Sequence, residues 1–141
     1  MKSFLLFLAV IVVFTLANSS APTVTNAADG SKKEMAVMKF HYTVTLMDVA
    51  LKGEYLFVHD DEAMARGEAC TYVYKGVSES AKNLVASFHC IPAVRAKAES
   101  FTVRTSMVSP GVYELKEYQF AGSTESHLVP VIHSEHVNVA P

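Results

Sequence analysis

Apolar and polar residues alternate with a period of two over most of the chain that follows residue 38. In a β-strand, successive side chains point to opposite faces of the sheet, so this alternation is typical of strands with one buried face. The clearest segment is residues 39–49, KFHYTVTLMDV, in which the apolar positions of one face are Phe40, Tyr42, Val44 and Leu46. The pattern therefore favours a β-sheet protein over a helical one.

Five further segments are rich in aromatic and β-branched residues, and turn or polar residues separate them: 53–61, 70–76, 84–92, 99–108 and 112–122. Within the last segment the apolar parity changes between Leu115 and Tyr118, which predicts a bulge near Glu117. Six or seven short strands with this spacing predict an all-β domain, either a small antiparallel sandwich or a barrel. The sequence does not decide between these two architectures.

Helical signals are confined to two short segments between the expected strands. Residues 60–67, DDEAMARG, place an aspartate at the N-cap and Gly67 at the C-terminal end. Residues 92–100 begin with Pro92, which suits the first position of a helix. Each segment is about two turns long, so we expect one or two short helical turns that connect strands.

The N-terminal segment has the pattern of a signal peptide for Sec-dependent export. Lys2 precedes an apolar run over residues 4–17, and small and polar residues follow it. A membrane-spanning helix needs about 20 apolar residues, so the run is too short for an anchor. We expect residues 1–21 to be a signal peptide, with cleavage near residue 21 or 27, and residues 22–33 to be a disordered leader. Residues 34–141 would then form a single β domain in the periplasm or outside the cell.

Charge and motif content exclude several classes of protein. The chain has 12 basic and 14 acidic residues and a net charge of −2, which argues against a basic surface that binds nucleic acid. It contains no P-loop, dinucleotide-binding glycine motif, nucleophile elbow or HExxH segment. We therefore expect a protein that is not an enzyme, needs no cofactor and binds no nucleic acid.

The two cysteines, Cys70 and Cys90, are the smallest set that can form a disulfide in an exported protein. Cys70 begins one expected strand and Cys90 ends the next, so antiparallel pairing of these strands would bring them together. Closing a loop of about 21 residues stabilises a domain by about 3 kcal/mol in the loop-entropy model. The alternation in LVASFHCIP places Cys90 in the core with Phe88, and His89 on the opposite face. We predict a Cys70–Cys90 disulfide.

Two alternatives use the cysteines for chemistry instead. His59, Cys70, His89 and Cys90 together have the ligand types of a tetrahedral zinc site, although neither cysteine belongs to a C-x2-C pair. A cysteine thiolate activated by His59 or His89 would be a nucleophile. Because free thiols in an oxidising compartment tend to pair, the disulfide is the favoured interpretation.

Histidines and acidic residues form two further candidate groups. His127, His133 and His136 could bind Cu(II) or Zn(II), but ordinary polar residues in a partly ordered C-terminal tail are the favoured interpretation. The acidic run that begins at Asp60 lacks the alternating oxygen ligands and the glycine of a calcium loop. Helix capping and a solvated turn explain this run better than a pair of catalytic carboxylates.

Three segments, HDDEAMARGEAC, SFHC and EYQFAG, follow one another at residues 59–70, 87–90 and 117–122. In this order they resemble segments that recur in a group of small exported bacterial proteins of unknown function. The likeness covers most of the chain that follows the leader. The resemblance implies one exported domain and no catalytic activity.

These observations predict an exported, non-enzymatic β domain that binds a partner protein or a small ligand. Loops at the ends of a rigid sheet often hold binding sites, which makes His59, Asp60 and Asp61 the candidate ligand-binding residues. The alternative is a metal-binding or redox protein of the cell envelope that uses its histidines and cysteines.

Overall fold

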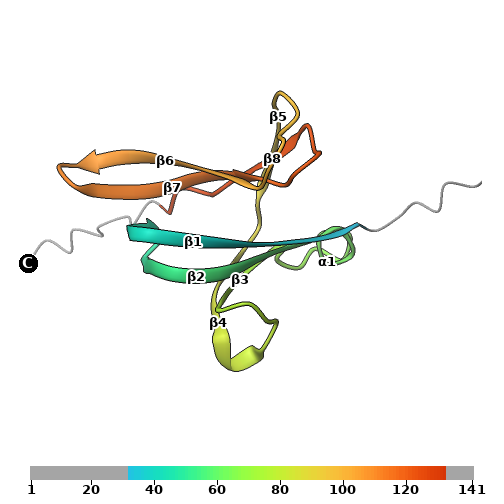
Figure 1. The fold of residues 1–141 in the computed structure, drawn as a ribbon. Coiled ribbons are helices and arrows are strands. Elements are labelled where there is room, and N and C mark those ends of the chain that lie inside the picture. The colour runs from blue at the N-terminus through green and yellow to red at the C-terminus, as the bar shows by residue number, and fades with distance from the viewer. Residues whose placement is uncertain (1–31, 133–141) are drawn as a thin grey trace, which may run out of the picture. The chain divides into compact units, whose positions relative to one another are not determined.

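Eight β-strands, one short α-helix and one 3-10 turn make up residues 32–132, the part of the chain that this computed structural model describes (Figure 1). The strands are β1 (Lys33–Leu46), β2 (Val49–Asp60), β3 (Thr71–Lys75), β4 (Leu84–Phe88), β5 (Ile91–Val94), β6 (Thr102–Ser109), β7 (Val112–Gln119) and β8 (Glu125–Leu128). The helix α1 is Asp61–Ala65, and the 3-10 turn η1 is Ala81–Asn83. The expected signal peptide, most of the expected leader, and His133 and His136 lie outside the described residues.

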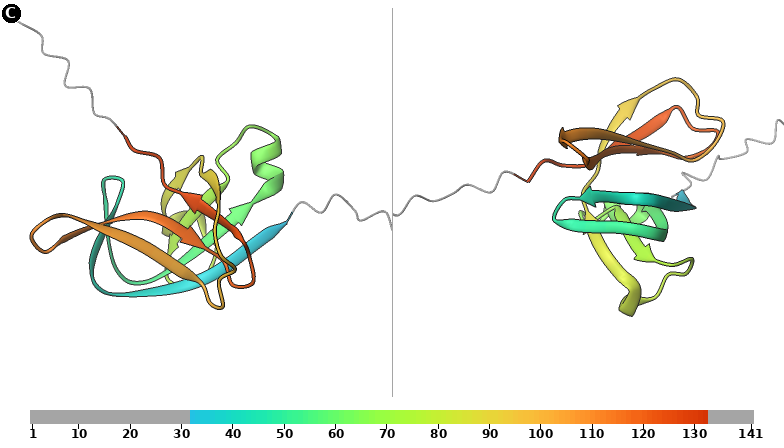
Figure 2. Two further views of the ribbon diagram at one scale, coloured as in Figure 1. Left: turned by 90° about the horizontal axis from the view of Figure 1, so that it is seen from above. Right: turned by 60° about the vertical axis from the view of Figure 1, so that its left-hand side comes forward.

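The strands form one curled sheet that closes about halfway to a barrel. Their order is β4-β3-β2-β1-β7-β8-β5, and β6 pairs with the other edge of β7. The pairing of β1 with β7 is parallel, whereas the other described pairings are antiparallel, so the sheet is mixed. Figures 1 and 2 show β6 and β7 lying over β1 and β2. The all-β prediction is confirmed, with a half-barrel as the architecture.

Two irregularities in pairing decide which side chains reach the core. β1 bulges against β2 over residues 41–43, and Tyr42 is consequently exposed although the alternation alone places it with the apolar face. The bulge predicted near Glu117 is confirmed, because Lys116 is the extra residue of β7 in its pairing with β6. This bulge allows Leu115 and Tyr118 both to be fully buried.

The core is enclosed by the curled sheet and is rich in aromatic side chains. Phe57 of β2 is fully buried, and its ring centroid lies 5.5 Å from that of Tyr118 on β7 and 5.4 Å from that of Phe101. Phe120 lies 5.2 Å from Phe101 and packs edge-on against Tyr118. Contacts of this kind hold the β2 part of the sheet against the β7 part and contribute beyond the burial of apolar area.

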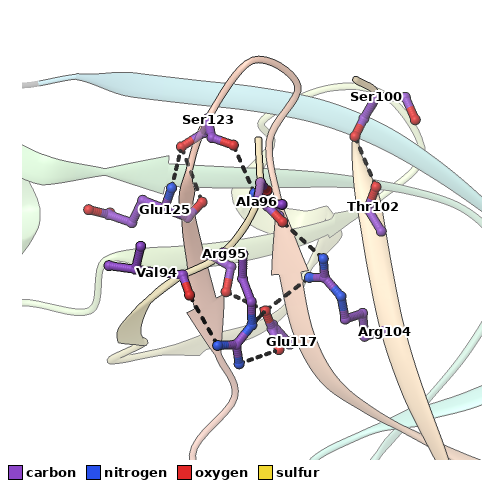
Figure 3. A network of polar contacts seen from close by, with 11 residues as sticks. Val94, Arg95, Ala96, Ser100, Thr102, Arg104, Glu117, Ser123 and Glu125 are labelled. Carbon is purple, nitrogen blue, oxygen red and sulfur yellow. Dashed lines mark hydrogen bonds and ion pairs between the residues drawn. The ribbon is translucent and has the colours of Figure 1, made fainter. Parts of the chain in front are cut away.

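A buried carboxylate joins the segments around β7 (Figure 3). Glu117 accepts two hydrogen bonds from the guanidinium of Arg95, at 2.9 and 3.1 Å, and one from Arg104 at 2.9 Å. The hydroxyl of Ser126 on β8 also donates to Glu117. Glu117 is only 6% exposed, but its charge can be buried because these hydrogen bonds surround the carboxylate.

Of the two expected helical turns, one is present and the other is a strand. The carboxylate of Asp60 accepts a hydrogen bond from the backbone N–H of Ala63, so the predicted N-cap of α1 is confirmed. The prediction for residues 92–100 is wrong, because Pro92 lies in β5 opposite His127 of β8 and no helix follows it. Pairing with β8 outweighs the local preference of the sequence. In the described part of the chain no helix is long and apolar enough to cross a membrane.

Candidate metal centre

Two cysteines and two histidines from four separate segments meet at one end of the sheet. The ligand atoms of His59, Cys90 and His127 all lie within 4.8 Å of one another. The Sγ atom of Cys70 lies 2.7 Å from that of Cys90. All four side chains are buried, with exposed fractions between 1% for His127 and 9% for Cys90. We refer to these four residues as the Cys2His2 cluster.

Strand pairing explains why residues so far apart in the sequence meet here. His59, near the end of β2, lies opposite Thr71 of β3, and Cys70 is the residue before Thr71. Thr71 in turn lies opposite Phe88 at the end of β4, and Cys90 follows two residues later. The chain then enters β5, which pairs with β8 and brings His127 to the same place.

The two cysteines are in contact, and the structure contains no bond between their sulfur atoms. The backbone N–H of Cys90 donates a hydrogen bond of 3.1 Å to Sγ of Cys70, which fixes the position of that sulfur. Burial raises the pKa of the Cys90 thiol to about 12, and the neighbouring Cys70 adds to the increase. As predicted, Cys90 is buried with Phe88, whereas His89 is exposed. The disulfide itself stays a prediction.

The histidine on β2 has one ring nitrogen held by a carboxylate and the other without a partner. Nδ1 of His59 lies 3.3 Å from a carboxylate oxygen of Asp61. Its Nε2 is fully buried and has no hydrogen-bond partner among the described residues. A carboxylate on one nitrogen of an imidazole holds the proton there and leaves the other nitrogen with a free lone pair, as in metal-binding histidines.

The histidine on β8 has the same unusual feature. The ring of His127 stacks on that of Tyr118, with centroids 4.9 Å apart, and lies 4.1 Å from the ring of His59. Its Nδ1 lies 3.6 Å from Sγ of Cys90, and its Nε2 is buried without a hydrogen-bond partner in the described part of the chain. Burial lowers the pKa of His127 to about 4, with His59 and Lys32 contributing, so the ring is neutral at neutral pH.

This set of donors suits a metal ion that prefers sulfur and imidazole. Two thiolates and two neutral imidazoles are the ligands of many tetrahedral zinc sites, and thiolates also favour Cu(I). Zinc bond lengths of about 2.3 Å to sulfur and 2.0 Å to nitrogen place tetrahedral ligand atoms roughly 3.3 to 3.8 Å apart. The ligand atoms of His59, Cys90 and His127 lie within 4.8 Å of one another, so small side-chain movements would bring them into that range.

The three residues predicted to bind a ligand, His59, Asp60 and Asp61, lie in different environments. His59 is buried in the Cys2His2 cluster, and Asp60 is occupied as the N-cap of α1. Asp61 contacts His59 on one side and accepts a hydrogen bond from the backbone N–H of Lys32 on the other. The three side chains therefore do not converge on one surface pocket.

The sequence suggested three of the four clustered residues and missed the fourth. The zinc alternative combined His59, Cys70 and Cys90 with His89, but His89 is exposed and His127 takes its place. The placement of His127 in a partly ordered tail is wrong, because it lies in β8 and is 1% exposed. This strand has four residues and lies between β7 and β5 in the sheet order, so it offers too few alternating positions to be recognised from the local sequence.

Comparisons of the chain with models of protein families, with curated proteins and with solved structures find no match.

Proposed function

We propose that this domain binds a thiophilic metal ion, with Zn²⁺ as the reference ion, through His59, Cys70, Cys90 and His127. The observation that supports this proposal most strongly is a pair of buried Nε2 atoms that have no hydrogen-bond partner within residues 32–132, on two histidines beside two sulfurs. A buried polar atom that lacks a partner costs about 1–3 kcal/mol. A metal ion bound by Nε2 of both histidines would explain why two such atoms occur in one cluster.

The arrangement supports a binding role over catalysis. Four protein ligands fill the coordination of a tetrahedral ion, and catalytic zinc sites instead keep one position open for water or substrate. The cluster is buried, so a bound ion would be shielded from solvent. Together with the signal-peptide pattern of the sequence, these features favour a non-enzymatic metal-binding protein of the cell envelope or the extracellular medium.

A second candidate is a ligand-binding β domain with a purely structural disulfide. The 2.7 Å separation of the Cys70 and Cys90 sulfurs favours this alternative, because a small movement would bring them to the 2.05 Å of a bond. The disulfide accounts for the cysteines. It leaves the two buried imidazoles unexplained, and for that reason we place the metal site first.

Metal analysis of the full chain, purified under reducing conditions without a histidine tag, tests the proposal. We expect one zinc ion per chain to survive dialysis. A variant with His133→Ala and His136→Ala provides the matched control for the C-terminal histidines, and it should retain the ion. The proposal fails if the wild-type protein retains no zinc or if the ion is lost in this control variant.

A further inference from the structure

The Cys2His2 cluster contains a pair of sulfurs that can take part in two mutually exclusive kinds of bond. Metal binding needs both cysteines as thiolates, whereas a disulfide removes both from the pool of ligands. The 2.7 Å between Sγ of Cys70 and Sγ of Cys90 allows either outcome with small side-chain movements. The same residues therefore couple metal binding to the redox state of the sulfurs.

We propose that the metal site is controlled by redox conditions: oxidation of Cys70 and Cys90 to an internal disulfide expels the metal ion, and reduction restores the site. This inference rests on the proposed metal-binding function. The oxidant that we consider is a low-molecular-weight or protein disulfide, the usual partner in thiol–disulfide exchange.

The chemistry balances as two successive exchange steps. The first protein thiolate attacks one sulfur of the oxidant, so a mixed disulfide forms and one thiolate of the oxidant leaves. The second protein thiolate attacks the protein sulfur of that mixed disulfide, which forms the Cys70–Cys90 bond and releases the second thiolate. Two electrons pass from the protein to the oxidant, the two leaving thiolates take up protons from water, and the metal ion is released.

Burial and strand position indicate which cysteine reacts first. Cys90 is 9% exposed and Cys70 is 1% exposed. Cys90 also directly precedes β5, which is at one end of the sheet order, and its neighbours His89 and Ile91 are exposed. An oxidant therefore has a shorter path to Cys90, and Cys70 is in place to resolve the mixed disulfide.

The structure also explains why oxidation would release the ion and not merely weaken one bond. A disulfide sulfur has no negative charge and is a poor ligand compared with a thiolate. Only His59 and His127 would remain, and two imidazoles without thiolates do not make a closed zinc site. The Thr71–Phe88 pairing holds the backbone close to each cysteine, so the bond can form without unfolding of the sheet.

The test uses the reduced full chain loaded with zinc, and its zinc content is measured before any oxidant is added. Glutathione disulfide is then added, and zinc release, free thiols and intact mass are followed together. We expect one zinc released for every two thiols lost, and a monomer lighter than the reduced chain by about 2 Da, the mass of two hydrogens. Treatment with a reductant should restore zinc binding.

The outcomes separate this inference from the proposed function. Retention of both free thiols together with zinc overturns the inference and leaves the metal site intact, whereas loss of the thiols with zinc retained also excludes Cys70 and Cys90 as its ligands. Zinc release through stable glutathione adducts or linked dimers also overturns it, and so does the absence of any thiol loss. A chain that holds no zinc before oxidation contradicts the proposed function itself, and the inference falls with it.

The variant Cys70→Ser tests the resolving role of Cys70. It should accumulate the mixed disulfide between Cys90 and glutathione, which the wild-type protein converts to the internal bond. The mass of the adduct can be measured even if the variant is partly unfolded. If the Cys70→Ser chain shows no adduct under conditions that oxidise the wild type, Cys90 is not the first residue to react.

Discussion

Nδ1 of His127 lies 3.6 Å from Sγ of Cys90, although 37 residues separate them in the sequence. The pairing of β5 with β8 produces this contact, because Pro92, two residues after Cys90, lies opposite His127. The contact joins a histidine and a sulfur of the Cys2His2 cluster directly. It therefore makes His127 the first residue to test.

We expect His127→Gln to weaken zinc binding by more than about 100-fold, because loss of a direct ligand should exceed the effect of losing a group that only orients one. His89→Gln is the matched control, since His89 is adjacent to Cys90 but exposed. Competition with a chromogenic chelator measures both affinities. Equal affinities in the two variants would remove His127 from the site.

Asp61 should act on the metal through His59. Its carboxylate lies 3.3 Å from Nδ1 of His59, and removal of such a partner lowers metal affinity by about 10- to 100-fold. Asp61→Ala should show this loss, whereas Glu68→Ala, which removes the same charge from an exposed position of the same turn, should not. A similar decrease in both variants would indicate a general effect of charge.

Thr71 and Tyr118 share a buried hydrogen bond between their hydroxyl groups, which joins β3 to β7. Tyr118→Phe leaves the Thr71 hydroxyl without this partner and should lower the free energy of unfolding by about 1–3 kcal/mol. Thr71→Val should have a similar effect, and the double variant should lose less than the sum. Urea denaturation measures all four proteins, and additive losses would argue against a shared bond.

Glu117 should make the domain sensitive to acid. Burial by itself raises the pKa of Glu117, but hydrogen bonds from Arg95 and Ser126 outweigh it, and the pKa lies below its ordinary value. The ionised form therefore stabilises the fold fully above about pH 4.3, the ordinary value for glutamate, and this contribution is lost as the pH falls through the folded pKa.

Unfolding measured between neutral pH and pH 2 without added metal should show a smaller loss of stability for Glu117→Gln than for the wild type. At neutral pH the same variant should be less stable, since it leaves Arg95 and Arg104 without their carboxylate. Parallel pH profiles for the two proteins would show that Glu117 does not contribute to the acid sensitivity.

Features of the fold that depend on neighbouring residues were predicted well from the sequence. The N-cap at Asp60 depends on a few neighbouring residues, and the bulge near Glu117 follows from a change of parity within one strand. The burial of Cys90 and the exposure of His89 follow from alternation in the same way. Each of these features is determined by residues close together in the chain.

The candidate metal centre depends on long-range pairing, and for that reason it could be predicted only in part. His59 lies in β2, and Cys70 and Cys90 lie next to the strands that follow it, so their meeting could be considered from the sequence. His127 reaches them through β8, a four-residue strand that pairs with β5 and β7. The same pairing explains why Pro92 begins no helix, and neither fact has a signal in the local sequence.

X-ray absorption spectroscopy at the zinc edge, on the reduced full chain loaded with one equivalent of the ion, tests the central claim most directly. The Cys2His2 cluster predicts two sulfur ligands at about 2.3 Å and two imidazole nitrogens at about 2.0 Å. A first shell of nitrogen and oxygen alone, with no sulfur, would place the ion elsewhere on the chain and contradict the assignment.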